Sequence, residues 1–313
     1  MTSAFLHKNS MAEMKPSKGL ILTSVPLFPK NIFGSSNSLP KQPAPAPLSS
    51  QNLAEQDKPG RKLFLIDWDD TLNPSSWCMH YGILTIRPPR KDEVNAVAGL
   101  SAKVLKTLTY CMEHGNVVIV TNAESGWVEK SARFLMPDVF QLLKKIPVVS
   151  ARSSFENDFR DSPITWKSMA FARIIAEWAE DESKLGHSFS IPGQVVSIGD
   201  SAHEREALFR VHADHSVKFS PKSLKFMDSP TISDLERQHD VLHSNFTSIL
   251  NEKAGGDLRY QHGLFVVFST PLANRRPQSI PAPMKQRRTL NAFPASKLIR
   301  VGGFQKSPFS RGN

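Results

Sequence analysis

Between residues 61 and 269, short apolar runs alternate with stretches whose apolar positions recur every three or four residues. The runs are KLFLI (62–66), NVVIVTN (116–122), IPVVSA (146–151), QVVSIGD (194–200) and HSVKFS (215–220). Such short apolar runs are typical of strands buried on both faces of a parallel sheet. We therefore predict an α/β fold with a parallel five-stranded sheet, right-handed crossovers and helices on both faces.

The stretches between these runs predict the helices. They cover about residues 93–113, 128–135, a short segment after Pro137, 164–180, 204–209 and 233–250. Gly115 follows the first of them, where a left-handed cap is common, and Pro163 precedes the fourth, where proline is tolerated. One further apolar run, LFVVF (264–268), predicts either another strand or a strip packed on the domain.

The two ends of the chain differ in composition from this middle part. Residues 1–60 are rich in Pro, Ser, Asn and Gln, and residues 270–313 carry nine Lys and Arg and no acidic residue. Because these ends offer few large apolar side chains to offset their ordering entropy, we predict that both are disordered. The predicted domain covers 61–250, with a catalytic core at 61–220 and a C-terminal helix at 231–250, and 251–269 holds the candidate extra strand.

The net charge of +10 belongs to the ends, since their basic surplus leaves residues 61–269 with a net charge of −2. Nucleic-acid binding is therefore not expected of the core, while the tail, with RRP (275–277) and KQRR (285–288), is a candidate segment for nuclear import or an anionic partner. No apolar run reaches about 18 residues, so we predict no membrane span. Two cysteines favour a reducing compartment, cytoplasmic or nuclear, and organelle targeting by the N-terminal segment stays open.

Polar side chains lie at the carboxyl ends of three of the predicted strands. They are Asp67, Asp69 and Asp70 after the first strand, Thr121 and Asn122 at the end of the second, and Asp200 at the end of the fourth, with Glu204 four residues on. The carboxyl ends of parallel strands meet at one edge of a sheet, where ligands bind. Convergent carboxylates suit a hard divalent cation such as Mg²⁺, and the cation would make their clustered charge tolerable. We regard Asp70 as a capping or solvated residue.

Asp67 and Asp69 alternate along an extended segment, so both side chains can reach one pocket. One carboxylate could attack a phosphorus atom while the other moves a proton. Lys167, near the start of a predicted helix, could neutralise a phosphate. The Thr121 hydroxyl and strand-end amides such as Asn122 could hold the phosphoryl oxygens.

DWDDT, VIVTN, a helix-borne Lys and IGDSAHE, in this order, resemble the four motifs of the haloacid-dehalogenase (HAD) superfamily over about residues 61–220. Asp67, Asp69 and Thr71 match DxDxT, and Thr121 matches the second motif. We assign Lys167 to the third motif, and GDxxxD is present with Glu in its last place. DWDDTLxPSxW also resembles poorly characterised HAD-like proteins of algae, oomycetes and other protists, which implies no particular activity.

The resemblance implies a Rossmann-like three-layer αβα sandwich and a Mg²⁺-dependent phosphatase. Asp67 would be the nucleophile that forms an aspartyl-phosphate, and Asp69 the general acid and then the base for water. An Asp at this second position favours phosphatases over dehalogenases and P-type ATPases. The Asp69 carbonyl and the Asp67 and Asp200 side chains would hold Mg²⁺, with Glu204 assisting directly or through water.

The resemblance leaves two questions open. Lys167 would meet the phosphate, but Arg152 and Lys130 are rivals for this role. About 73–92, the segment we call the flap, has room for a small β-hairpin and no cap domain, so we expect an essentially capless enzyme. Its open site would admit a macromolecular phosphoester such as a phosphoprotein or a nucleic-acid end, although a second subunit or a tail could also close it over a small molecule. Arg87 or Arg90 would meet the anionic substrate.

Two other functions compete with the phosphatase. The chain could be a catalytically weak HAD-like scaffold that binds a partner through its tails and C-terminal helix. A phosphotransferase or another activity of the superfamily is the third reading.

Overall fold

A computed structural model describes residues 61–184, 193–214, 217–252 and 254–268. The segments predicted to be disordered, 1–60 and 270–313, lie outside these residues. No helix in the described ranges has both the length and the apolar character needed to cross a bilayer.

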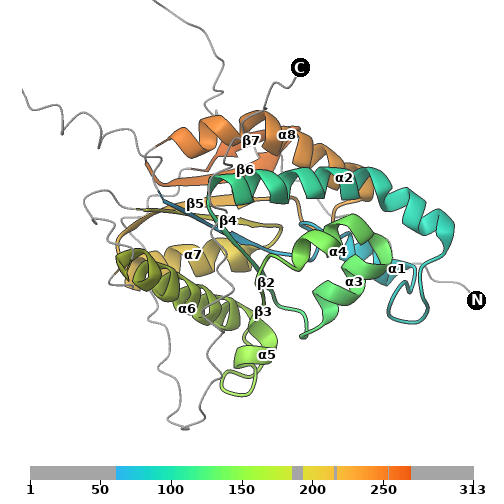
Figure 1. The fold of residues 1–313 in the computed structure, drawn as a ribbon, viewed down its shortest axis with the longest axis horizontal. Coiled ribbons are helices and arrows are strands. Elements are labelled where there is room, and N and C mark those ends of the chain that lie inside the picture. Colours follow the sequence, from blue (N-terminus) through green and yellow to red (C-terminus); the bar gives the residue numbers. More distant parts are fainter. Residues whose placement is uncertain (1–60, 185–192, 215–216, 253, 269–313) are drawn as a thin grey trace, which may run out of the picture. The chain divides into compact units, whose positions relative to one another are not determined.

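A mostly parallel sheet forms the centre of the described part, with seven strands in the order β3-β2-β1-β4-β5-β6-β7 (Figure 1). The strands are β1 (Lys62–Ile66), β2 (Asn116–Thr121), β3 (Val148–Ser150), β4 (Gly193–Gly199), β5 (Phe219–Lys225), β6 (Gly256–Gln261) and β7 (Leu264–Val267). The first six are parallel, and β7 runs antiparallel to β6. The predicted α/β class with a largely parallel sheet is confirmed.

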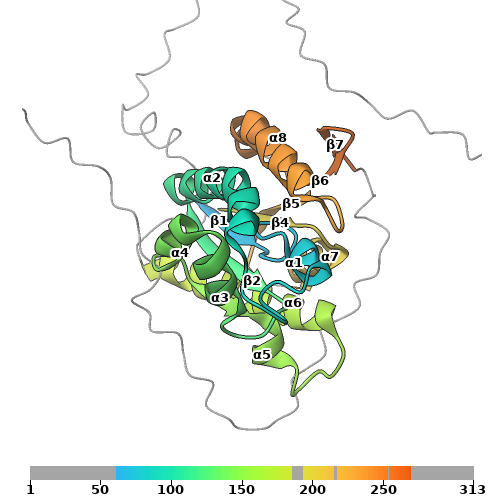
Figure 2. The same cartoon turned by 90° about the vertical axis from the view of Figure 1, so that its right-hand side faces the viewer.

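Helices cover both faces of the sheet in a Rossmann-like arrangement (Figures 1 and 2). One face carries α2 (Lys91–His114), α3 (Trp127–Leu135), α4 (Pro137–Leu143) and α8 (Ile232–Asn251), and the other carries α5 (Ala151–Phe155), α6 (Pro163–Lys184) and α7 (Ala202–Asp214). In β1, Phe64 and Ile66 pack under the first group, while Leu63 and Leu65 pack under the second. Because side chains on both faces are buried, the strand is apolar at every position from Leu63 to Ile66.

The prediction of five strands is wrong in number and in its last member. Of the predicted strand 215–220, residues 215 and 216 lie outside the described residues, and β5 begins only at Phe219. Its sequence FSPKSLK contains proline and two lysines and does not look apolar. The ammonium of Lys222 is buried and donates hydrogen bonds to the carbonyls of Ile249 and Glu252, near the end of α8. Beyond β5, Leu258 of β6 and Phe265 of β7 pack against the α8 side of the core, which extends the sheet.

The flap is not the predicted β-hairpin. It contains α1 (Ser75–His80), followed by turns closed by an isolated bridge between Ile83 and Arg87. Asp70, itself in the left-handed region at φ 51°, accepts hydrogen bonds from the backbone N–H of Ser76 (2.8 Å) and from its hydroxyl. This buried carboxylate satisfies a free N–H in the first turn of α1, so Asp70 caps a helix, as expected, and it is not solvated.

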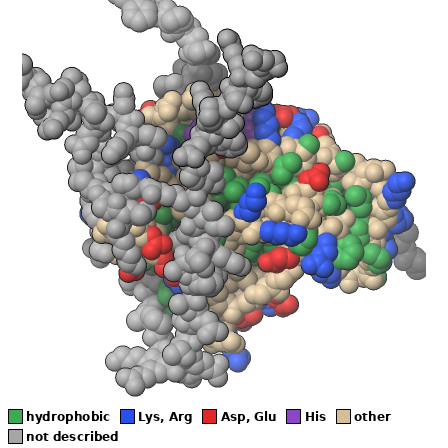
Figure 3. Space-filling model, in the orientation of Figure 1, with side chains coloured by type: hydrophobic (Ala, Val, Ile, Leu, Met, Phe, Trp, Pro, Cys, Tyr) green, Lys and Arg blue, Asp and Glu red, His purple; other side chains and the backbone are tan. Residues whose placement is uncertain are grey.

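The flap also exposes apolar side chains. Met79, Tyr81 and Ile86 are 72, 53 and 87 % exposed. Hydrophobic side chains mixed with Lys and Arg are visible on the right in Figure 3, over α3 and α4.

Candidate active site

The candidate site lies at the carboxyl ends of β1, β2 and β4. β1 pairs with β2 on one side and β4 on the other. The strands after β1 are therefore added first on one side of it and then, from β4 on, on the other, which makes the end of β1 a topological switch point. Asp67 is the first residue beyond β1, and its N–H donates to the carbonyl of Ile198 at 2.9 Å. The backbone of the nucleophile candidate is therefore held by the neighbouring strand.

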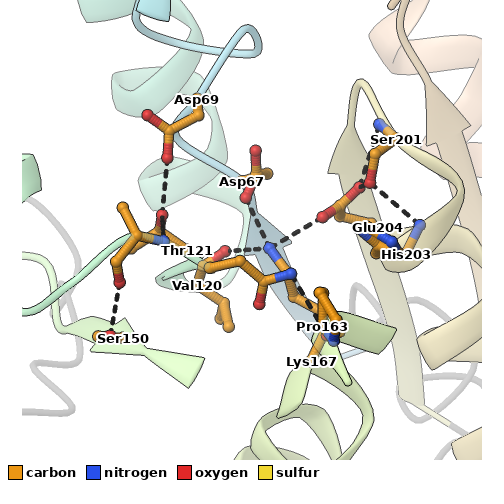
Figure 4. Close-up of polar contacts among 12 residues, drawn as sticks. Asp67, Asp69, Val120, Thr121, Ser150, Pro163, Lys167, Ser201, His203 and Glu204 are labelled. Atoms are coloured by element: carbon orange, nitrogen blue, oxygen red, sulfur yellow. Dashed lines mark hydrogen bonds and ion pairs between the residues drawn. The ribbon is translucent and has the colours of Figure 1, made fainter. Parts of the chain in front are cut away.

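Lys167 connects the predicted first and fourth motifs (Figure 4). It lies in the second turn of α6 and is fully buried. Its Nζ is 2.6 Å from Asp67 Oδ1, 2.8 Å from Glu204 Oε1 and 2.8 Å from the Val120 carbonyl oxygen. An ammonium has three hydrogens to donate, so these three acceptors satisfy it.

The buried charges perturb one another. Burial raises the pKa of Asp67 well above its ordinary value, opposed by attraction to Lys167 and reinforced by repulsion from nearby carboxylates. Burial also disfavours the Glu204 carboxylate, but attraction to Lys167 and hydrogen bonds from Lys167 and Ser201 outweigh it and lower the pKa of Glu204 to about 2. For Lys167, burial is outweighed by Asp67 and Glu204, so its pKa is raised. The site therefore holds more carboxyl groups than ammonium groups.

Glu204 is fully engaged by protein groups. Its Oε2 accepts from the Ser201 hydroxyl at 2.5 Å and from the Ser201 N–H at 3.2 Å, while Oε1 faces Lys167. The predicted role of Glu204 beside a metal stays a prediction, because in this arrangement it orients Lys167 instead.

Asp69 is turned toward β2 and α3. Its Oδ2 accepts from the Thr121 hydroxyl at 2.8 Å, and its Oδ1 accepts from Trp127 Nε1 at 2.7 Å and from the Ser75 hydroxyl at 2.5 Å. In Figure 4 the Asp69 carboxylate points to Thr121, whereas that of Asp67 points to Lys167. The two carboxylates thus share one strand end but have different partners.

Asn122 follows Thr121 at the same edge. Its Nδ2 donates to the Pro163 carbonyl at 3.3 Å, and its buried Oδ1 has no partner among the described residues. The backbone N–H of Ala123 donates to the Thr121 hydroxyl oxygen at 2.9 Å. The Thr121 hydroxyl is therefore held between Ala123 and Asp69, and its predicted contact with phosphate would require an exchange of partners.

The other predicted cations have partners elsewhere. Arg87 makes a two-pronged ion pair with Glu93, and Arg90 contacts the same carboxylate at 2.9 Å. These ion pairs with Glu93 hold the flap against the start of α2. Both guanidinium groups are therefore engaged there and not with the carboxylates of the candidate site. Of the rivals to Lys167, Lys130 donates to the Leu84 carbonyl and Arg152 pairs with Glu156.

A magnesium site would have to draw on Asp67, Asp200 and the Asp69 carbonyl. Asp67 Oδ2 takes part in none of the hydrogen bonds found among the described residues. Burial, together with repulsion from Glu204 and Asp70, raises the pKa of Asp200 to about 7. Within the described ranges, no three Asp, Glu, His or Cys side chains stand close enough to form a complete metal site. These oxygen donors fit Mg²⁺ in kind, since Mg²⁺ keeps several waters and needs only one or two carboxylates.

Three residues of this network were not predicted from the sequence. Ser75 has a detectable signal, because DDTLNPSS places two serines six residues after two aspartates, and Ser75 binds Asp69 as Ser76 binds Asp70. Ser201 sits inside the recognised GDSAHE segment. Trp127 carries no signal, because nothing in the chain indicates which tryptophan returns to the strand end.

Comparison of the chain with protein-family models, with curated proteins and with solved structures found no significant match.

Proposed function

We propose that this protein is a HAD-type phosphatase that hydrolyses a phosphomonoester through an aspartyl-phosphate on Asp67. The observation that carries the proposal is the contact of one buried ammonium, Lys167, with both Asp67 and Glu204. The third motif was assigned from the place of Lys167 along the chain and the fourth from its match to GDxxxD, and an accidental resemblance would not require their side chains to meet. The sheet order β3-β2-β1-β4-β5 also supports it, because β1, β2 and β4, whose ends carry the segments matched to the first, second and fourth motifs, are neighbours in the sheet.

In the proposed mechanism, the reaction has two balanced steps. Asp67 Oδ2 attacks phosphorus, the bond from phosphorus to the leaving oxygen breaks, and the protonated Asp69 carboxyl gives its proton to that oxygen. Asp69, now a carboxylate, takes a proton from the water that attacks the phosphoaspartate, and the bond between phosphorus and Asp67 breaks to release phosphate.

The surrounding groups support these steps electrostatically. Lys167 favours the ionised form of Asp67 and offsets the charge of the phosphoryl group. A bound Mg²⁺ would supply further neutralisation of phosphoryl oxygens, and Asp67, Asp200 and the Asp69 carbonyl would hold it. The buried Asn122 Oδ1, which has no hydrogen-bond partner among the described residues, is left to accept a hydrogen bond from a substrate group.

The substrate class follows from the elements around the site. Between β1 and α2 the described chain contains only α1 and turns, and between β2 and α6 it contains α3, α4, β3 and α5, all packed on the sheet. No cap domain is inserted among the described residues, so the site is suited to a phosphate on a macromolecule such as a protein.

The test is phosphate release from 4-nitrophenyl phosphate with Mg²⁺, with EDTA, and with the Asp67→Asn variant. We expect turnover that needs Mg²⁺ and is lost in Asp67→Asn, while Asp138→Asn, the same change at an exposed position, keeps it. Asp69→Asn should accumulate phosphorylated Asp67, detectable by mass spectrometry, because the base for water is missing. Turnover that survives in Asp67→Asn would refute the mechanism.

The alternative is a catalytically weak HAD-like scaffold. It is favoured by one observation, the engagement of both Glu204 oxygens by Lys167 and Ser201. A folded protein that binds no Mg²⁺ and releases no phosphate from aryl phosphates or phosphopeptides would support the scaffold.

A further inference from the structure

Asp69 is held by two side chains outside the four motifs. Beside Thr121, the donors to its carboxylate are Trp127, the first residue of α3, and Ser75, the first residue of α1. Both bind Oδ1, at 2.7 and 2.5 Å. An indole N–H can only donate, so Trp127 can serve this carboxyl group only by holding an acceptor oxygen in place.

Helix α3 also forms a hydrogen bond with Trp68, the residue next to Asp69. The fully buried Trp68 donates its indole N–H to Ser131 Oγ at 2.9 Å, and Ser131 Oγ donates to the Trp127 carbonyl at 2.8 Å. Trp127 then returns to Asp69 through its own indole. The contacts form a closed circuit through Trp68, Ser131, Trp127 and Asp69, which fixes this loop against α3 from two adjacent residues.

We propose that Trp127 and Ser75 are positioning residues that set the orientation of Asp69 and thereby control proton transfer to the leaving group. This inference rests on the proposed function. Proton transfer needs hydrogen-bond distance between the acid and the leaving oxygen, and small misplacements are costly. Holding Oδ1 by two donors on different helices leaves Oδ2, bound by Thr121 alone, as the oxygen that exchanges its partner for the substrate.

If Trp127 and Ser75 position the proton donor, their loss should affect substrates according to the leaving group, which a general loss of structure would not do. A nitrophenolate departs without a proton, whereas an alkoxide departs only if it receives one. Loss of the positioning residues should therefore impair alkyl phosphates, such as the phosphoserine of a protein, far more than 4-nitrophenyl phosphate.

The kinetic test compares benzyl phosphate, which has an alkoxide leaving group, with 4-nitrophenyl phosphate. For Trp127→Phe, kcat/KM should fall about tenfold or more on benzyl phosphate and less than about threefold on 4-nitrophenyl phosphate. We compare kcat/KM because it covers only the steps up to and including departure of the leaving group. The later attack of water on the phosphoaspartate does not affect it. Ser75→Ala should shift the ratio in the same direction, and it serves as the second variant if Trp127→Phe does not fold.

The matched control is Trp77→Phe, the same substitution at a tryptophan of α1 that packs on Tyr81. It should leave the ratio of the two substrates unchanged. An equal loss on both substrates in Trp127→Phe and Ser75→Ala would overturn the inference, because it would show that the residues only support the fold.

A second readout does not depend on activity. In an NMR spectrum of the ¹⁵N-labelled protein, the Trp127 indole signal, identified by its loss in Trp127→Phe, should move upfield in Asp69→Asn, because an amide oxygen is a weaker acceptor. The Trp77 signal should not move. An unmoved Trp127 signal would overturn the contact itself. If the indole responds but the wild type hydrolyses neither substrate, the proposed function fails, and the role in proton transfer fails with it.

Discussion

Lys167 Nζ lies 2.6 Å from Asp67 Oδ1 although the two residues are 100 positions apart in the chain. Both side chains are buried, and the same ammonium contacts Glu204. Removing one member of such a set leaves the others as uncompensated buried charges. The ion contacts are therefore a requirement of the fold as well as of the proposed chemistry.

Lys167→Met should destabilise the protein by about 3–5 kcal/mol, because Asp67 and Glu204 lose their cation inside the core. Urea unfolding measures this loss. Adding Glu204→Gln should recover part of it, since one buried charge is then removed. Lys145→Met, the same change at an exposed lysine, should cost less than about 0.5 kcal/mol. A loss in Lys167→Met no larger than that of the control would contradict the prediction.

Gly199→Ala should displace Glu204. A Cβ at Gly199 would lie 2.4 Å from Glu204 Cγ and 2.8 Å from Glu204 Oε2, closer than atoms can approach. We expect a loss of about 1–3 kcal/mol in stability together with loss of activity. In a Glu204→Ala background the same substitution should cost at least about 1 kcal/mol less, because the clash is gone. Strictly additive free energies of unfolding in this double-mutant cycle would argue against the contact.

His239 should make stability depend on pH. It lies on α8 and is fully buried against the first motif and α2, with Nε2 3.1 Å from the Thr71 carbonyl oxygen and Nδ1 2.8 Å from Thr107 Oγ1. Since a carbonyl only accepts, Nε2 carries the proton and Nδ1 accepts from the Thr107 hydroxyl. Burial lowers the pKa of His239 from 6.5 to about 4.

The sign follows from proton binding. Between pH 6.5 and 4 the unfolded chain binds a proton at His239 that the folded protein does not, so stability falls as the pH is lowered through this range. The expected loss is about 3 kcal/mol by pH 4. The stability difference between the wild type and His239→Gln isolates it, because the other groups titrate in both proteins. A pH-independent difference would show that His239 titrates normally.

Mg²⁺ should stabilise the folded protein through Asp200. Saturating Mg²⁺ is expected to raise Tm by about 4 °C or more, since binding to the folded state alone shifts the unfolding equilibrium. Asp200→Asn should abolish most of this increase, and Asp138→Asn should preserve it. An equal increase in all three proteins would place the cation elsewhere.

Much of the fold could be predicted from the sequence because β1, β2 and β4 each contain a largely apolar run (LFLI, VVIV and VVSI), as expected of strands buried on both faces. Of the outer strands, only β7 was indicated, as one of two interpretations of the apolar run LFVVF (264–268). β5 contains a buried lysine whose acceptors are carbonyls near the end of α8, and β6 (GDLRYQ) contains no apolar run. Their place in the sheet depends on α8, which lies beside β1 through the contact of Phe64 with Phe246.

The candidate site divides in the same way. Asp67, Asp69, Thr121, Asp200 and Glu204 follow strands, and parallel strands bring their carboxyl ends to one edge, so the order of the chain alone determined that they would gather. The partner of each side chain was decided only in three dimensions. Lys167 reaches Asp67 because α6 packs across β1 and β2, Arg87 is drawn to the buried Glu93, and Trp127 closes on Asp69 because Trp68 is anchored to Ser131. Hydrogen bonds and ion pairs act over about 3 Å, so they depend on rotamers and helix positions that no pattern along the chain records.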